Sequence, residues 1–136
     1  MFLIFLLSFL TLCLFLILSI WFHEYSHALA AKILGWKTHG MTIVWKKAAI
    51  GYKIEINQDK PEDIWKIAAA GLLGTIILSM TALFFSFIFP IFSILFYMNI
   101  GILLINLIPI SGSDGTYLWK RIKAHFRRPS GTHSET

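Results

Sequence analysis

The feature that most constrains the fold of this chain is an almost unbroken run of Leu, Phe and Ile over residues 2–22. As an α-helix, such a run is long enough to cross the roughly 30 Å hydrocarbon core of a bilayer. Hydrophobic residues make up 57% of the chain and charged residues only 14%, a balance far more apolar than that of soluble domains. The run has neither the basic n-region nor the small-residue cleavage site of a signal peptide, so we interpret it as a retained transmembrane helix.

Polar and apolar segments alternate along the remaining residues and set the expected order of elements. Gly35 is expected to end the first helix, and Pro90 is expected to break a later apolar run. We expect one domain over residues 1–128 and a disordered tail over 129–136. The expected elements are helices over about 2–34, 62–89 and 91–108, a β-hairpin over about 40–56 and a surface helix over about 116–128.

The positive charges are confined to two intervals of the chain. All twelve Lys and Arg residues fall in 32–66 or 120–128. Charge segregated in this way indicates membrane topology and argues against a nucleic-acid partner, despite the net charge of +5. Because Lys and Arg favour the cytoplasmic side, we expect the N-terminus outside and the C-terminus in the cytoplasm. The sequence therefore predicts an α-helical integral membrane protein with three transmembrane helices and a short membrane-surface β-hairpin between the first two.

The sequence His23-Glu24-Tyr25-Ser26-His27 follows the first apolar run directly. On a helix, side chains four residues apart lie on one face, so the two histidines can bind one Zn²⁺ ion. Glu24 lies beside the first histidine, where its carboxylate can accept a proton from water and pass it to a leaving amine. The alternative is a pair of hydrogen-bonded structural histidines. Ionisable groups are costly in a membrane and usually mark functional sites, which favours one zinc ion per chain.

A catalytic zinc site needs a third protein ligand and keeps its fourth position open. Downstream of the predicted hairpin, Asp114 is the only acid at membrane depth. The predicted topology places residues 109–115 and residues 23–27 at one level, near the cytoplasmic end of the helices. Asp114 could instead cap the C-terminal helix, a frequent role for Asp. Its predicted depth favours the ligand role.

Three blocks of sequence resemble the site-2 protease family of intramembrane metalloproteases, and most closely its stage IV sporulation protein FB-like branch. The first block is the His23–His27 motif after an apolar helix. The second, residues 70–75, stands where the family has Ala-Gly-Pro-Leu-x-Asn. The third, Asn106-Leu107-Ile108-Pro109 followed by Asp114-Gly115, is similar to the family's Asn-x-x-Pro…Asp-Gly pattern. Together the blocks cover roughly residues 8–120.

The resemblance implies a role for each matching residue. It implies His23, His27 and Asp114 as zinc ligands, Glu24 as general base, and Asn106 as a polar group that helps to bind the substrate backbone or the oxyanion. It also implies a three-helix core in a prokaryotic cell membrane that cleaves transmembrane segments of other proteins. The second block departs from the pattern, because Leu72 and Thr75 replace its Pro and Asn. This departure puts substrate contacts of that block in doubt and leaves the metal ligands unchanged.

The predicted hairpin offers a strand edge to which an extended substrate could be added. We expect Tyr52, Ile54 and Ile56 on that edge, with a purely structural hairpin as the alternative. We expect no regulatory domain of the PDZ or CBS type, so a membrane regulator would be a separate partner. The sequence does not indicate the oligomeric state.

Three other functions are alternatives to proteolysis. A catalytically silent relative that binds membrane proteins should have lost Glu24 or Asp114, and both are present. A prenyl-protein type of protease needs a glutamate as third ligand, and no downstream Glu lies at suitable depth. Three crossings with one polar cluster provide no obvious path for a zinc transporter.

Overall fold

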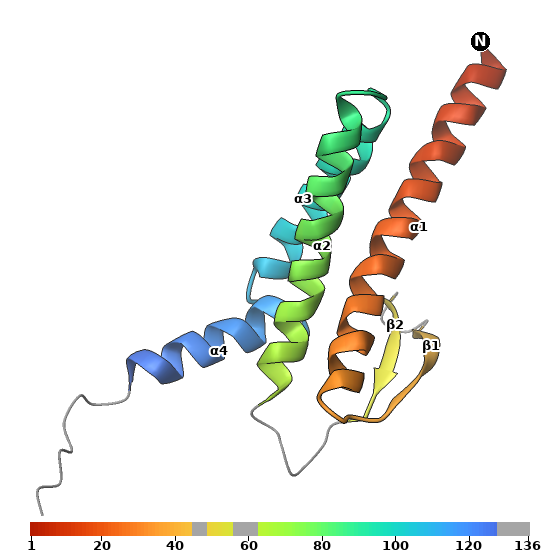
Figure 1. Ribbon diagram of the computed structural model, residues 1–136. Coiled ribbons are helices and arrows are strands. Elements are labelled where there is room, and N and C mark those ends of the chain that lie inside the picture. The colour runs from red at the N-terminus through yellow and green to blue at the C-terminus, as the bar shows by residue number, and fades with distance from the viewer. Residues whose placement is uncertain (45–48, 56–62, 128–136) are drawn as a thin grey trace, which may run out of the picture.

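The computed structural model describes residues 1–44, 49–55 and 63–127, and it is mainly helical (Figure 1). Four helices and one two-stranded antiparallel sheet lie within these residues. The predicted helical class and the small hairpin are therefore confirmed. The elements are α1 (Phe2–Ile33), β1 (Thr38–Val44), β2 (Ala49–Ile54), α2 (Ile64–Ser86), α3 (Phe92–Leu107) and α4 (Asp114–Phe126).

Helix α1 ends at the predicted glycine through a specific set of backbone hydrogen bonds. Gly35 has a φ of 79°, a left-handed conformation that glycine adopts without steric cost. The N–H of Gly35 donates to the carbonyl of Lys32 and the N–H of Trp36 to that of Ala31, which is a Schellman motif. Trp36 is thereby folded back onto α1, where Ala31, Trp36 and Ile67 form a small buried cluster.

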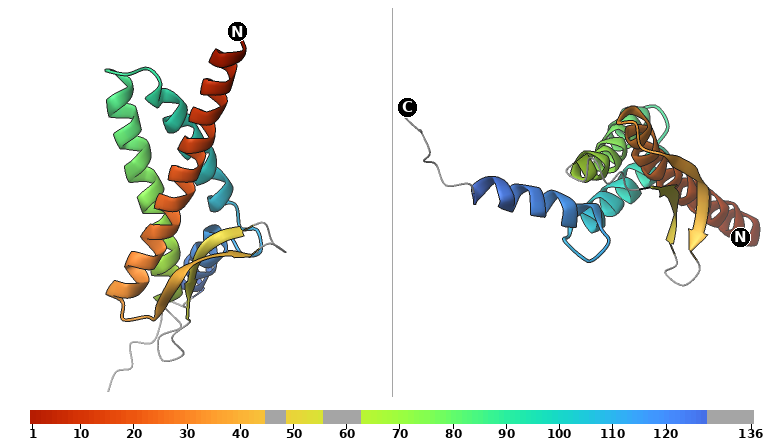
Figure 2. Two further views of the ribbon diagram at one scale, coloured as in Figure 1. Left: turned by 90° about the vertical axis from the view of Figure 1, so that its right-hand side faces the viewer. Right: turned by 90° about the horizontal axis from the view of Figure 1, so that it is seen from below.

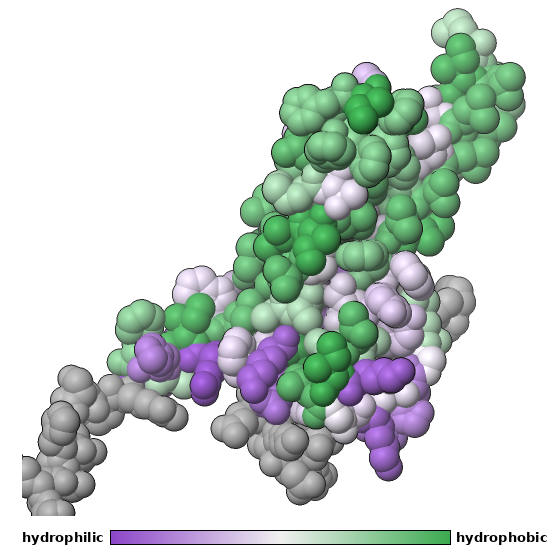
Figure 3. Space-filling model, in the orientation of Figure 1, coloured by the Kyte–Doolittle hydropathy of each residue, from purple (hydrophilic) through white to green (hydrophobic). Residues whose placement is uncertain are grey.

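The three apolar helices run side by side, and α4 leaves the bundle at one end (Figures 1 and 2). Within the described residues, α1 and α2 are long and apolar enough to cross a membrane. Helix α3 is also apolar, but its 16 residues span about 24 Å, less than the hydrocarbon thickness. Figure 3 shows hydrophobic residues over the bundle and hydrophilic residues gathered at the base, where the hairpin and α4 lie.

The observed bounds differ from the expected ones at two helix ends. Helix α2 ends at Ser86 rather than near residue 89, because residues 87 and 88 already form a turn before Pro90. Helix α4 begins at Asp114, two residues earlier than expected, with Ser113 in the capping position. The expected start of the second helix at 62, the last hairpin residue Ile56, and the tail lie outside the described residues.

Candidate metal centre

The two histidines of the His23–His27 motif lie in the second half of α1 and are buried against α2. The Nδ1 atom of His27 is 2.8 Å from the carbonyl oxygen of Ile67, and the Nδ1 atom of His23 is 3.0 Å from that of Gly71. A carbonyl only accepts hydrogen bonds, so Nδ1 carries the proton in both rings. The Nε2 atom of each ring therefore presents a lone pair, as in metal-binding histidines.

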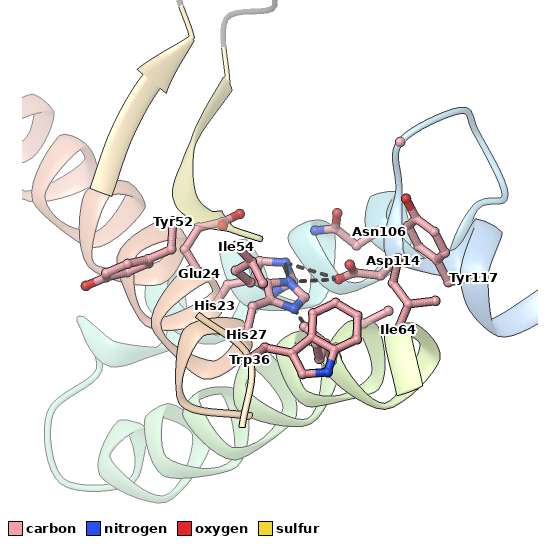
Figure 4. Close-up of a pocket in the computed structure, with 13 residues that line it drawn as sticks. His23, Glu24, His27, Trp36, Tyr52, Ile54, Ile64, Asn106, Asp114 and Tyr117 are labelled. Carbon is pink, nitrogen blue, oxygen red and sulfur yellow. Dashed lines mark hydrogen bonds and ion pairs between the residues drawn. The ribbon is translucent and has the colours of Figure 1, made fainter. Parts of the chain in front are cut away.

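Asp114 reaches these rings from the first turn of α4. Its Oδ2 atom lies 3.3 Å from the Nε2 atom of His23 and 3.3 Å from that of His27 (Figure 4). The two Nε2 atoms are 3.1 Å apart. Side chains separated by about ninety residues in the sequence thus place three ligand atoms in a nearly equilateral triangle, and the three residues form a group that could hold a metal ion.

The triangle has the dimensions of one face of a tetrahedral zinc site. Zinc bonds of about 2.0 Å place tetrahedral ligand atoms about 3.3 Å apart, close to the three separations seen here. The Oδ2 atom of Asp114 is buried and accepts no hydrogen bond within the part of the chain that is described. Two lone pairs and an orphaned carboxylate oxygen that face one another need a cation between them, so these residues fit a zinc ion.

The ionisation of Asp114 suits a metal ligand. Burial by itself raises the pKa of this carboxyl group, but positive charge beside it, carried by protonated His23 and His27 when no cation is bound, outweighs burial and holds the pKa below its usual range. The side chain therefore stays a carboxylate at neutral pH. The capping alternative has no support among the described residues, because the N-cap is Ser113 and no side-chain cap hydrogen bond is present.

A glycine in α2 lets that helix approach the metal site closely. A Cβ atom built at Gly71 would collide with the imidazole of His27. The same glycine supplies the carbonyl that faces His23. Gly115, next to Asp114, is packed so closely on the carbonyl of Leu107 that a Cβ atom would collide there as well. Glycines at both positions therefore allow the ligands from α1 and α4 to meet.

Thr75 contacts a predicted ligand, which the sequence did not indicate. Its Oγ1 atom donates a hydrogen bond to the carbonyl of Gly71 at 3.0 Å and lies 2.8 Å from the Nδ1 atom of His23. Because the hydroxyl proton is already used, Thr75 accepts the Nδ1–H of His23. The replacement of the family's Asn therefore lies beside the metal site, and not only at a substrate contact as we had inferred. The sequence feature that could have indicated this contact is a polar residue, Thr75, one turn after Gly71 in an otherwise apolar helix.

Glu24 lies on the other side of the two imidazoles from Asp114 (Figure 4). Its carboxylate accepts a hydrogen bond from the backbone N–H of Tyr52 in β2. A Cβ atom at Gly51 would come within 2.7 Å of the Glu24 Oε2 atom, so β2 packs directly on this side chain. The hairpin therefore positions the predicted general base.

The other predicted site residues lie around the same pocket of about 370 Å³. Asn106 lines it, and its Nδ2 atom donates to the carbonyl of Ile102 at 3.0 Å. Tyr52 and Ile54 line the pocket from β2, whereas Ile56 lies outside the described residues. Trp36, Ile64 and Tyr117, which were not predicted, also line it.

A hydrogen bond between His39 and Glu55 links the two strands at the open end of the sheet. Strands β1 and β2 pair from Thr38–Ile54 to Val44–Ala49, with an irregularity between Thr38 and Met41. The Nε2 atom of His39 is 2.8 Å from the Oε1 atom of Glu55, and this hydrogen bond lowers the pKa of the Glu55 carboxyl. Both side chains are exposed, so the pair contributes little to stability.

Comparison with known proteins adds one finding to this geometry. A family model described as Peptidase M50B-like matches residues 1–117, which include every residue of the pocket. No curated protein matches the chain.

Proposed function

This chain belongs to the Peptidase M50B-like family, a family of metallopeptidases, and from that premise we propose that it is an intramembrane zinc metalloendopeptidase. The observation that carries the proposal is the triangle of ligand atoms from His23, His27 and Asp114 with Glu24 beside it. The match supports the resemblance to site-2 proteases. The closer assignment to the stage IV sporulation protein FB-like branch stays a prediction.

Zinc is the proposed metal because of the ligand chemistry. Two imidazole nitrogens and one carboxylate oxygen are a common donor set for catalytic zinc, whereas Mg²⁺ and Ca²⁺ favour all-oxygen sites. Three protein ligands would leave a fourth position for water or substrate. One zinc ion per chain is expected.

The membrane arrangement is proposed from the apolar helices and the charges. Helices α1 and α2 cross the bilayer, and α3 crosses with the help of apolar residues at both of its ends, such as Ile91 and Ile108. The end of α1, the start of α2 and helix α4 lie at the same end of the bundle as the hairpin (Figure 1). Lys and Arg gather there, so this end is cytoplasmic and the N-terminus is outside. The resemblance to site-2 proteases adds the expectation of a prokaryotic cell membrane.

Different residues of the pocket have different proposed roles in peptide hydrolysis. Bound zinc would supply a Lewis acid that polarises the scissile carbonyl and acidifies water. Glu24 accepts a proton from the attacking water at a carboxylate oxygen and delivers it to the leaving amine nitrogen. The Nδ2 group of Asn106 uses one hydrogen on the Ile102 carbonyl, and its second hydrogen would stabilise the developing oxyanion or hold the substrate backbone.

A transmembrane protein is the proposed substrate, and β2 the proposed strand to which it adds. A helical substrate must unwind before its peptide bonds can be reached, and its exposed backbone groups then need partners. Tyr52 and Ile54 line the pocket, so this strand is close enough to supply partners, and Ile56 continues it in the sequence. Since the N–H of Tyr52 already donates to Glu24, a substrate would pair first near Ile54. A separate membrane protein would act as regulator.

The decisive experiment is Glu24→Gln in the full chain, co-expressed with single-span membrane proteins as candidate substrates. Loss of a general base should reduce cleavage by about 10²- to 10⁴-fold while zinc stays bound. Glu55→Gln, which changes an exposed glutamate of the hairpin in the same way, serves as the matched control and should retain cleavage.

Unchanged cleavage by Glu24→Gln would reject the protease proposal. A wild-type chain that binds zinc and captures membrane proteins without cleaving any of them would favour the alternative of a catalytically silent, regulatory member of the family.

A further inference from the structure

Helix α4 has an apolar stripe that the bundle does not cover. Trp119, Ile122 and Phe126 are spaced three and four residues apart and therefore lie on one face. Their exposed fractions are 46%, 44% and 82%. The stripe is part of a helix with one polar and one apolar side, the pattern of helices that lie in a membrane interface.

Basic residues flank this stripe. Lys120, Lys123 and Arg127 project next to one another on the adjacent side of α4, and all are exposed. Asp114 is the only acidic residue in α4. A helix that combines exposed aromatic and aliphatic residues with a row of cations complements an apolar surface covered by anionic headgroups.

The position of α4 agrees with such a surface. The helix extends sideways from the base of the bundle (Figures 1 and 2), below the hydrophobic band of the spans in Figure 3. It therefore lies where the apolar surface of the bundle gives way to hydrophilic residues. A helix at that level would bury its apolar stripe at the boundary between acyl chains and headgroups.

The same helix carries one predicted zinc ligand. Asp114 is its first residue, and Tyr117, one turn later, lines the pocket. Arg121 lies over the Trp65 ring of α2 at 5.5 Å from its centroid, which joins α4 to the bundle. A helix moves as a rigid body. A contact that fixes the orientation of the exposed half of α4 therefore also fixes the position of the Asp114 carboxylate at its first residue.

We propose that α4 binds the headgroups of anionic lipids, and that this binding holds Asp114 in place at the metal site. Lipid composition would then regulate metal retention. This proposal rests on the proposed function, because it requires bound zinc and a membrane. It adds anionic lipid as a partner and lipid-dependent retention of zinc as a form of regulation.

The first test measures hydrogen exchange of α4 in the full chain, reconstituted in bilayers of phosphatidylcholine with or without phosphatidylglycerol. Amides of residues 119–126 should be protected more strongly with phosphatidylglycerol, and added salt should remove the difference. Lys120→Glu with Lys123→Glu should weaken this protection, by about fivefold for each basic side chain lost. Lys37→Glu with Lys53→Glu, which reverses two exposed hairpin charges, is the matched control and should leave α4 protection unchanged.

The second test measures the rate at which a chelator removes zinc in the same bilayers. Zinc should leave the wild-type chain several-fold more slowly with phosphatidylglycerol, and the α4 charge reversal should abolish that difference. Equal α4 protection in both bilayers overturns the proposal, and protection that rises only with protein density assigns the stripe to a second copy of the chain. Lipid-dependent protection with equal zinc release overturns the link to Asp114.

These failures differ from a failure of the proposed function. Absence of bound zinc in both bilayers, or cleavage that survives Glu24→Gln, rejects the protease. Neither result removes the dependence of α4 hydrogen exchange on phosphatidylglycerol and salt, so the lipid contact is judged separately.

Discussion

Residues 2–18 and residues 19–33 belong to the same helix, α1, but they differ in what surrounds them. Within the described chain, the buried residues of α1 all fall in its second half, at Ser19, His23, His27, Ala28 and Ala31. In the first half, large hydrophobic side chains such as Phe5 and Ile17 are exposed. The half that packs on other helices is thus the one with small and polar residues on its contact face.

This difference has a physical basis. Lipid is as apolar as Leu or Phe, so large hydrophobic side chains gain little by leaving lipid for another helix. Ser19, His23, His27 and Ala31 recur every four residues and make one ridge along the helix. Small side chains in that ridge allow close approach, and polar ones find hydrogen-bond partners on α2 and α3. The active half of α1 is therefore specified by its polar and small residues rather than by its hydropathy.

The largest effect is expected at Asp114, the predicted zinc ligand in α4 that faces the two histidines in the second half of α1. Asp114→Asn removes the negative charge that faces the two histidines. Zinc affinity should fall by more than the 10- to 100-fold that is typical when a residue hydrogen-bonded to a metal ligand is replaced, and cleavage should be lost. Metal analysis of purified protein and a chelator titration measure this. Asp63→Asn, at the start of α2, is the control. Full zinc occupancy in Asp114→Asn would remove Asp114 from the ligand set.

A methyl group at the contact between α1 and α2 should be the next most damaging change. Gly71→Ala places a Cβ atom against the His27 ring, so either the ring or the helix must move. We expect loss of zinc and a lower free energy of unfolding, by about 1–3 kcal/mol. Gly101→Ala in α3 is the matched control, because no described atom lies within 4 Å of its Cβ position. Similar behaviour of the two variants would contradict the close approach of α2.

Thr75 should affect the metal more than the fold. Thr75→Val keeps the shape but removes the oxygen that accepts the Nδ1–H of His23, and zinc affinity should fall about 10- to 100-fold. Thr75→Ser restores the oxygen and should rescue binding. Thr81→Val is the control, since Thr81 makes the same bond to a carbonyl four residues earlier but is exposed. Loss of affinity in both Val variants would assign the effect to α2 as a whole.

The smallest effects should separate the two halves of α1 directly. Ser19→Leu introduces a large side chain where Ser19 accepts a hydrogen bond from buried Asn99 and should destabilise the bundle by about 1–3 kcal/mol. Ser8→Leu makes the same change at an exposed position of the first half and should be nearly neutral. Unfolding in mixed detergent measures both. Equal destabilisation would show that the first half also packs against protein.

Sequence patterns anticipated much of this fold because the membrane simplifies the problem. Apolar runs and Gly35 indicated the helices, and the end of α1 follows from a local backbone motif. The residues of the metal site could be proposed because few ionisable groups occur at membrane depth. The early start of α4 was missed, since Asp114 is both a first-turn residue and a group that faces α1, and no local pattern reveals the second contact.

The hairpin shows where local patterns were insufficient. Alternation of side chains predicted a strand near Tyr52, but not that the Tyr52 N–H donates to Glu24. That hydrogen bond depends on how β2 packs on α1, which is set by contacts between segments far apart in the sequence. The contact of Thr75 with His23 was missed for the same reason.

The sequence by itself determined the elements of this protein and its candidate chemistry, because helix length, helix ends and the spacing of His23 and His27 are local properties. Only the tertiary structure decided the geometry. It brought Asp114 to 3.3 Å from both Nε2 atoms, assigned the proton to Nδ1 through the carbonyls of Ile67 and Gly71, and placed Thr75 beside His23. These contacts arise from helix packing, in which one glycine decides how closely two ridges approach, and sequence spacing does not encode that distance.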